Sequence, residues 1–109
     1  MARAIMVGRF QPVHKGHVEV VKQVLQEVDE LIIGVGSSQE GHTLENPFTA
    51  GERVLMLEKA LEEAKVDRSR IRIVQIPDIH DDAKWVSHVA SLSPEFSIAY
   101  SRNPWVQRL

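Results

Sequence analysis

The sequence predicts an α/β protein in which parallel strands alternate with helices. Three observations indicate that class: short apolar runs of strand length recur along the 109 residues, segments with apolar residues at helical spacing separate them, and glycine or proline follows most of the runs. Strands joined by helical crossovers lie parallel, and we expect helices on both faces of the sheet. We also expect one domain over residues 1–109, because a chain of this length buries a single core.

The first elements follow from a change in hydrophobic period. Residues 4–7 form an apolar run closed by Gly8, and residues 31–35 form another that ends at Gly36. Both runs are typical of buried strands. Between them, apolar side chains recur on one face of a helix that we expect to begin at Gly16. They are Val18, Val21, Val24, Leu25 and Val28. A polar loop follows the second strand as far as about residue 48.

The rest of the chain repeats this alternation. Thr49 and Glu52 have the spacing of a capping box, which binds free N–H groups at a helix start. The helix that they open carries apolar residues at helical spacing, namely Val54, Leu57, Leu61 and Ala64. We expect a third strand over 71–76, a third helix over 83–92 and a fourth strand over 96–100. Asn103 and Pro104 are typical of one more helix start.

Composition excludes several classes of function. The chain has no cysteine, which excludes disulfide scaffolds, cysteine-bound zinc and thiol nucleophiles. Its formal net charge of −2 indicates no broad basic surface, so we expect neither nucleic-acid nor membrane binding. No apolar run has the length of a membrane span, and the first strand begins too close to Met1 to leave a signal peptide. We therefore expect a cytoplasmic protein.

The segment from Gly8 to His17 is the strongest candidate for a functional site. It leads from the first strand into the first helix, whose free N–H groups and dipole attract anions. Its potential cations are Arg9, His14, Lys15 and His17. Its spacing does not fit a Walker A loop, and the Gly34-x-Gly36 pair after the second strand lacks the third glycine of a dinucleotide fingerprint. The segment thus indicates a phosphate site, although two histidines three residues apart are also compatible with a solvated surface or with metal ligands.

Residues 8–17, Gly-Arg-Phe-Gln-Pro-Val-His-Lys-Gly-His, resemble the His-x-Gly-His signature of the nucleotidylyltransferase superfamily. Residues 29–33, 36–38, 42–53, 77–79, 85–88 and 103–104 extend the resemblance to the archaeal-type nicotinamide-nucleotide adenylyltransferases. The resemblance implies a Rossmann-like nucleotidylyltransferase fold with strand order 3-2-1-4. It also implies transfer of AMP from ATP to nicotinamide mononucleotide, giving NAD and pyrophosphate, with Mg²⁺ carried by the ATP phosphates.

The resemblance also implies roles for individual residues. His14, His17 and Arg9 form the catalytic set, because the histidines would donate hydrogen bonds to the ATP phosphates and the guanidinium would bind their oxygens. The further ATP contacts are Gly8, Phe10, Arg102 and Asn103. The mononucleotide contacts are Ser37, Ile79, Asp82 and Trp85, the last of which would stack on the nicotinamide ring. No residue is assigned to a metal held by the protein itself.

The sequence departs from the family pattern at three places. Asp82 stands where an asparagine is usual, and Arg102 stands where a glycine is usual. The chain also stops at Leu109, whereas family members continue through a fifth strand and a second phosphate-contacting segment. We therefore expect the fifth strand to be missing, the fourth strand to form a sheet edge, and the chain to be a homo-oligomer.

Two alternatives remain open. One is another nucleotidylyltransferase, acting for example on phosphopantetheine or using CTP. The other is a catalytically weak nucleotide-binding or assembly module, which the absence of the second phosphate-binding motif would favour.

Overall fold

The computed structural model describes residues 2–77 and 85–100, and only the backbone of Trp85, Val86 and Ala99. Its elements, in chain order, are β1 (Arg3–Gly8), α1 (Lys15–Leu25), β2 (Glu30–Gly36), α2 (Ala50–Glu63), a short 3-10 helix (Arg68–Arg70), β3 (Ile71–Ile76), α3 (Trp85–Leu92) and β4 (Ile98–Tyr100). The alternation of strands and helices that the hydrophobic periods predict is therefore present. Among the described residues, no helix is both long and apolar enough to cross a bilayer.

The strands form one parallel sheet with the order β3-β2-β1-β4. β1 and β2 lie at its centre, and their register places Ile5 beside Ile32 and Gly8 beside Val35. Both strands are largely buried, as their continuous apolar runs predict for a sheet covered on both faces. The predicted α/β class with a parallel sheet is confirmed.

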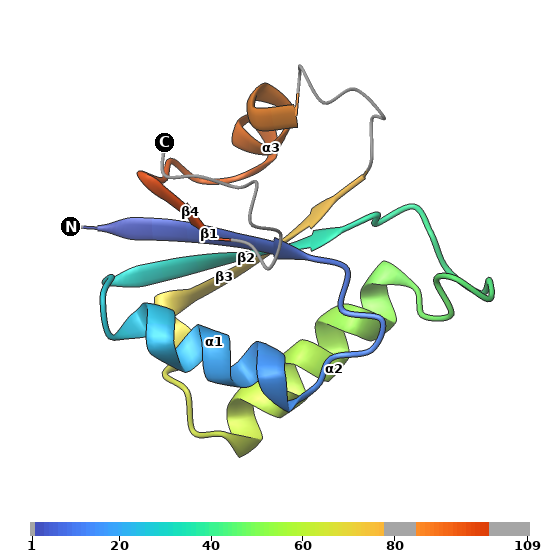
Figure 1. The fold of residues 1–109 in the computed structure, drawn as a ribbon, viewed down its shortest axis with the longest axis horizontal. Coiled ribbons are helices and arrows are strands. Elements are labelled where there is room, and N and C mark those ends of the chain that lie inside the picture. The colour runs from blue at the N-terminus through green and yellow to red at the C-terminus, as the bar shows by residue number, and fades with distance from the viewer. Residues whose placement is uncertain (1, 78–84, 101–109) are drawn as a thin grey trace.

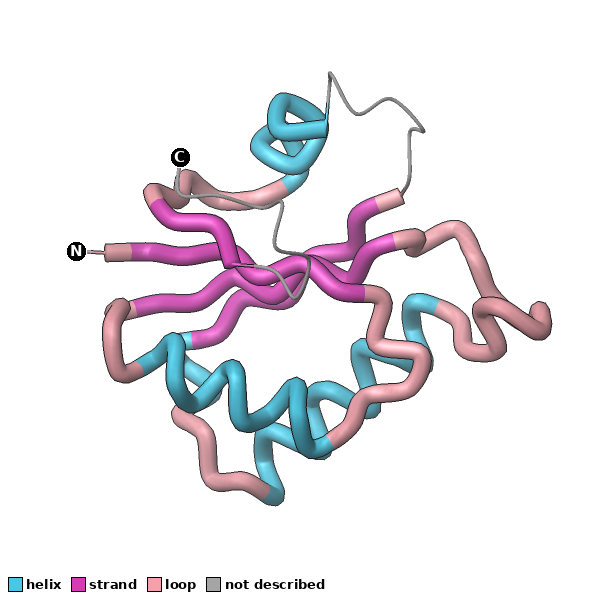
Figure 2. Tube along the Cα trace, in the orientation of Figure 1, coloured by secondary structure: helices cyan, strands magenta, loops and turns pink. Residues whose placement is uncertain are grey.

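The helices cover the two faces of the sheet unequally. Helices α1 and α2 lie together on one face, and α3 lies on the other (Figures 1 and 2). Successive strand side chains point to opposite faces, so each face has its own core. The core on the side of α1 and α2 includes Met6, Val21, Ile33, Leu57 and Leu61. The core on the side of α3 is smaller and consists of Ile5, Ile32, Ile76 and Val89.

Several predicted boundaries differ from those observed, and two of the differences have a clear physical reason. Helix α1 begins at Lys15 with His14 as its N-cap, and not at Gly16, because the His14 side chain accepts a hydrogen bond from the N–H of Gly16. Strand β4 begins at Ile98, while Phe96 packs instead against the smaller core. The predicted helix residues 83–84 and the predicted helix start at residues 103–104 lie outside the described residues.

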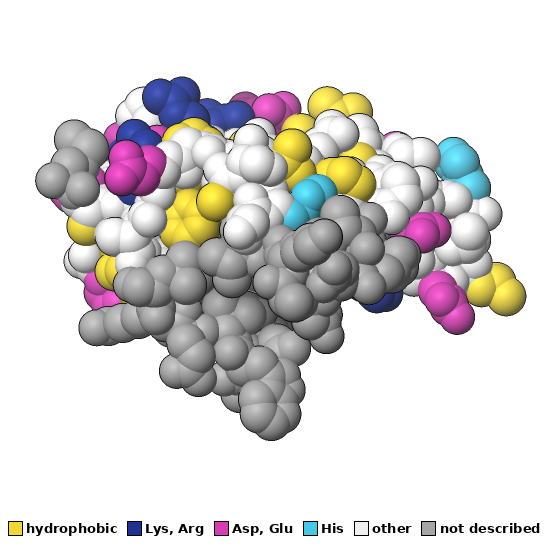
Figure 3. Space-filling view, turned by 90° about the horizontal axis from the view of Figure 1, so that it is seen from above, with side chains coloured by type: hydrophobic (Ala, Val, Ile, Leu, Met, Phe, Trp, Pro, Cys, Tyr) yellow, Lys and Arg dark blue, Asp and Glu magenta, His cyan; other side chains and the backbone are white. Residues whose placement is uncertain are grey.

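Arg70 links two segments at the end of the sheet where the strands begin. The guanidinium of Arg70 donates hydrogen bonds to the carbonyls of Leu25, Val28 and Asp29 at 2.7, 2.6 and 2.9 Å. These carbonyls belong to the turn that leads from α1 to β2, while Arg70 directly precedes β3. The contact therefore holds the turn before β2 against the start of β3. Figure 3, seen from the side of α3, shows small groups of basic, acidic and apolar side chains among the described residues of that face.

Candidate functional site

Two loops meet where the central strands end. The β1 loop (residues 9–14) follows β1, and the β2 loop (residues 37–49) follows β2. Because these strands are parallel neighbours, both loops leave the sheet at the same end, on the right in Figure 1. In parallel α/β sheets, ligands bind at this end of the strands.

A hollow lies on each side of Arg9. The first has a volume of about 610 Å³ and is lined by the β1 loop, by the start of α1 and by Tyr100 of β4, and Gly8, Arg9, Phe10, His14 and His17 are among its residues. The second, of about 480 Å³, lies between Arg9 and the β2 loop and is lined by Ser37 and Asn46 among others. Arg9 is exposed and lines both, so one cation faces two adjoining spaces.

The β1 loop packs tightly on the aromatic ring of Phe10. This residue is buried and adopts a left-handed backbone with φ of 55°, which bulky residues rarely adopt. A Cβ atom at Gly8 would lie 3.2 Å from the Phe10 ring, so glycine allows this close approach. The ring of Phe10 also lies 4.6 Å from that of His17, measured between centroids. The buried ring of Phe10 therefore packs under the β1 loop and against the ring of His17.

The two histidines form a capping box at the start of α1. The backbone N–H of His14 donates to Nδ1 of His17 at 3.0 Å, and the N–H of Gly16 donates to Nδ1 of His14 at 3.0 Å. Their ring centroids lie 3.9 Å apart. Because both Nδ1 atoms accept hydrogen bonds, the neutral rings carry their hydrogen on Nε2. Each histidine is therefore held in the tautomer whose Nε2 is a donor, as binding of a phosphate oxygen requires.

The β2 loop begins with a buried serine. Ser37 is 3% exposed and has a left-handed φ of 50°. Further on, Thr43 and Asn46 close a turn, in which the N–H of Asn46 donates to Oγ1 of Thr43 at 2.9 Å and the N–H of Thr43 to the carbonyl of Asn46 at 3.2 Å. The loop ends at Thr49, whose hydroxyl accepts from the N–H of Glu52 as the predicted capping box requires. The structure thus confirms that Thr49 and Glu52 cap α2.

Arg53 joins the two loops, although the sequence pattern did not predict it as a site residue. It is buried with 0% exposure, although it is charged. Its guanidinium donates to the carbonyls of Arg9, Gly36, Ser37, Glu40 and Thr49 at 2.8, 2.7, 3.0, 3.2 and 3.2 Å. Burial lowers the pKa of Arg53 from its usual value, and the nearby charge of Arg9 lowers this pKa further. One signal was present in the sequence, because Arg53 occupies the same helical stripe as the buried Leu57 and Leu61.

Gln11 forms a second contact between the loops. Its side-chain Nε2 donates to the carbonyl of Phe48 at 2.8 Å, and its Oε1 accepts from the N–H of Phe48 at 2.8 Å. The amide side chain thus pairs with the backbone of the β2 loop as a neighbouring strand would. No periodicity in the sequence indicates this contact.

The structure does not describe the side chains of several predicted site residues. Ile79, Asp82, Arg102 and Asn103 lie outside the described residues, and for Trp85 only the position at the start of α3 is described. In the described part of the chain, no group of three His, Asp or Glu side chains is arranged to hold a metal ion. The structure therefore brings together Gly8, Arg9, Phe10, His14, His17 and Ser37 from the predicted set.

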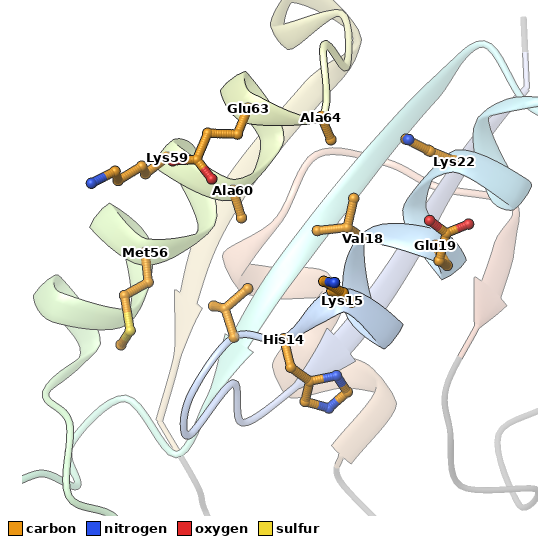
Figure 4. Close-up of a pocket in the computed structure, with 11 residues that line it drawn as sticks. His14, Lys15, Val18, Glu19, Lys22, Met56, Lys59, Ala60, Glu63 and Ala64 are labelled. Carbon is orange, nitrogen blue, oxygen red and sulfur yellow. The ribbon is translucent and has the colours of Figure 1, made fainter.

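A larger hollow of about 720 Å³ lies elsewhere, between α1 and α2. In Figure 4, Val18, Glu19 and Lys22 come from α1, and Met56, Lys59 and Glu63 come from α2. His14 lies at one end of it. This groove runs along the helices and is lined by both lysines and glutamates, whereas the described lining of the hollow around His14 and His17 contains no carboxylate.

These features define a class of protein: a parallel α/β domain in which a helix start with two histidines and an arginine lies at the carboxyl ends of the strands. The family model described as "Cytidylyltransferase-like" matches residues 5–109. The chain belongs to this cytidylyltransferase-like family, and the resemblance seen in residues 8–17 is thereby confirmed.

Curated relatives are similar to this chain over most of its length. The nicotinamide-nucleotide adenylyltransferase of Archaeoglobus fulgidus is 57% identical over 111 residues, which cover 98% of this chain and 63% of that protein. The enzyme of the same name from Thermoplasma acidophilum is 51% identical over 107 residues, covering 98% of this chain and 59% of that protein. The chain thus spans about three-fifths of the length of these relatives.

Two solved structures share the fold. Both are of a bifunctional NMN adenylyltransferase/ADP ribose pyrophosphatase from Francisella tularensis. The structure complexed with AMP and a manganese ion has a TM-score of 0.74 and 30% identity, covering 83% of this chain and 28% of that one. The other has a TM-score of 0.77 and 28% identity, covering 92% of this chain and 30% of that one.

Proposed function

We propose that this protein transfers the adenylyl group of ATP to nicotinamide mononucleotide, giving NAD and pyrophosphate. The observation that carries the proposal is the pair of histidines at the start of α1, each held through Nδ1 as a donor at Nε2 beside Arg9. The names of the relatives that are 57% and 51% identical to the chain support the choice of substrates.

The reaction is an in-line displacement at the α-phosphorus of ATP. A phosphate oxygen of the mononucleotide forms the new P–O bond, and the bond from the α-phosphorus to the bridging oxygen breaks, so pyrophosphate leaves with the electron pair. The attacking oxygen is already anionic, so no general base is needed. Catalysis then consists of alignment and charge stabilisation.

The two hollows beside Arg9 suit two substrates. ATP would bind in the hollow lined by Gly8, Phe10, His14 and His17, where the histidines and Arg9 would donate to its phosphates. The mononucleotide would bind on the side of Ser37. Mg²⁺ would enter with the ATP phosphates as part of the substrate. The related structure that contains AMP and a manganese ion supports a divalent ion at this step.

The proposal extends to residues whose side chains the structure does not describe. Trp85, Ile79 and Asp82 would contact the mononucleotide, and Arg102 and Asn103 would contact ATP. We also propose that residues 1–109 form one nucleotidylyltransferase domain whose sheet order, β3-β2-β1-β4, is that of the family. The position of β4 at the edge of the described sheet supports a homo-oligomer formed through that edge, which sedimentation at several concentrations would test.

The direct test is product formation from defined substrates. The chain is incubated with magnesium ATP and nicotinamide mononucleotide, and NAD is measured by an enzymatic cycling assay. Parallel reactions replace ATP with CTP and the mononucleotide with phosphopantetheine. NAD formation that depends on both ATP and the mononucleotide is the expected result. A product from another substrate pair alone would contradict the proposal.

A further inference from the structure

Arg53 uses every donor that its guanidinium has. The group carries five N–H bonds. In the structure Nε donates to the carbonyl of Thr49, Nη1 to those of Arg9 and Gly36, and Nη2 to those of Ser37 and Glu40. All of these partners are backbone carbonyls, and no ion pair to a carboxylate is formed within the described residues. The charge is therefore balanced by peptide dipoles drawn from three segments of the chain.

The partners lie in the parts of the molecule that would contact the substrates. Arg9 begins the β1 loop, Gly36 ends β2, and Ser37 and Glu40 belong to the β2 loop. A guanidinium is planar and rigid, so its donors impose a fixed geometry on the groups that they bind. Arg53 thus fixes the distance between the β1 loop and the β2 loop.

The donors of Arg53 serve the loops and not the apolar core. Leucine would continue the stripe of Leu57 and Leu61, but it would leave the loop carbonyls that Arg53 binds without this donor. The reciprocal pair between Gln11 and Phe48 ties the same two loops again, close to Arg9. The contacts of Arg53 and of Gln11 are independent, and both therefore hold the β1 loop and the β2 loop at the same separation.

We infer that Arg53 is a positioning residue for the transfer reaction, which holds the β1 loop and the β2 loop at the separation that aligns the attacking phosphate with the α-phosphorus. This inference rests on the proposed function. Arg53 touches neither substrate and acts through the carbonyls of Arg9 and Ser37. Because a misplacement of about 1 Å can lower a rate about 100-fold, the separation of the loops matters for turnover.

The test compares Arg53→Lys and Arg53→Gln with Arg70→Lys. Lysine keeps the charge but cannot reach carbonyls on all sides, and glutamine removes the charge. Arg70 is a matched control, because its guanidinium also binds backbone carbonyls, but at the opposite end of the sheet. The first measurement needs no substrate. Since the chain has no cysteine, spin labels can be placed through Lys15→Cys and Glu45→Cys, and their distance distribution can be measured by pulsed electron resonance.

We expect Arg53→Lys and Arg53→Gln to broaden this distribution and to lower kcat about 100-fold per folded molecule, with smaller changes in KM. We expect Arg70→Lys to leave the distribution and kcat unchanged, even where it lowers the melting temperature. A distribution as narrow as that of the parent chain, or an unchanged kcat in folded Arg53→Lys, would overturn the inference.

A second variant covers the case in which the Arg53 variants do not fold. Gln11→Ala removes the other contact between the loops, and we expect the same two changes with smaller amplitude. Unchanged loop distances and kcat in Gln11→Ala would then count against the inference. If the parent chain makes no NAD, the proposed function fails, whereas the label distances still decide whether these residues fix the separation of the loops.

Discussion

The Nδ1 atom of His17 accepts a hydrogen bond from the backbone N–H of His14 at 3.0 Å, so the second histidine of the signature caps the helix that the first one begins. The hydrogen bond at Nδ1 fixes the orientation of the ring, and this orientation sets the direction of Nε2. A helix start that would commonly use serine or threonine here uses two imidazoles, which couples the fold of the loop to its chemistry.

The first prediction follows from that coupling. His17→Ala removes an Nε2–H donor that would stabilise the departing pyrophosphate, and loss of one such donor typically lowers kcat by about 10²–10³-fold. Steady-state NAD formation measures the effect. Lys15→Ala is the control, since Lys15 is an exposed cation two residues before His17, and we expect less than about a tenfold change there. Equal effects of both substitutions would remove His17 from the catalytic role.

The second prediction concerns the packing of Gly8. In Gly8→Ala the new Cβ would lie 3.2 Å from Cε2 and Cζ of Phe10, whose buried ring leaves little room to move. We expect a loss of about 1–3 kcal/mol in the free energy of unfolding. Urea denaturation measures it.

Gly51→Ala serves as the control for this substitution. A Cβ atom there would meet nothing within 4 Å, and the residue lies in the first turn of α2. Alanine favours a helix over glycine by about 0.5–1 kcal/mol, so we expect this variant to be slightly more stable. Destabilisation of both variants to the same degree would show that the Phe10 ring is not the cause.

The third prediction concerns pH. Hydrogen bonds from the backbone and side chain of Thr49 lower the pKa of Glu52 below its ordinary value of 4.5. A lowered pKa in the folded state means that the carboxylate contributes stability above its unfolded pKa, and that this contribution is lost as the pH falls through the folded value. The stability difference between the parent chain and Glu52→Gln should therefore shrink below about pH 4.5. Thermal unfolding across this range measures it, and a difference that grows on acidification would contradict the assignment.

The fourth prediction tests the main core. Leu57→Ala removes a side chain that is 0% exposed between α2 and the sheet, and such truncations cost about 2–5 kcal/mol. Leu55→Ala, on the same helix at 67% exposure, should change stability by less than about 0.5 kcal/mol. Similar losses in both variants would mean that α2 presents a different face to the sheet.

The sequence predicts the backbone plan well and the loop contacts poorly. Hydrophobic period alone indicates β1, β2 and β3, because each is a short apolar run between glycine, proline or polar residues. The Thr49–Glu52 cap is local, and its spacing is enough to predict it. The start of α1 is misplaced by one residue, because histidine is not the usual N-cap and its capping depends on the ring tautomer.

Long-range contacts explain most of what the sequence does not predict. Arg53 binds Arg9 and Gln11 binds Phe48 across 44 and 37 residues, and no pattern of spacing encodes such pairs. Phe10 appears in the sequence only as a residue inside a phosphate-binding segment. Its burial beneath Gly8 becomes visible only when the loop adopts the left-handed backbone at residue 10. A polar residue on a buried helical stripe is the one signal that would have directed attention to Arg53.

The unequal cover of the two sheet faces has a consequence for how the molecule opens. Regions with few buried apolar contacts exchange their amide hydrogens through local unfolding at lower free energy than the main core. Helix α3 rests on the smaller core of Ile5, Ile32, Ile76 and Val89, whereas α1, α2 and the β1 loop contribute to the larger one, against which Ile98 and Tyr100 of β4 also pack. The molecule is therefore expected to open first from the α3 side, as a partly unfolded form in which the β1 and β2 loops keep their native arrangement.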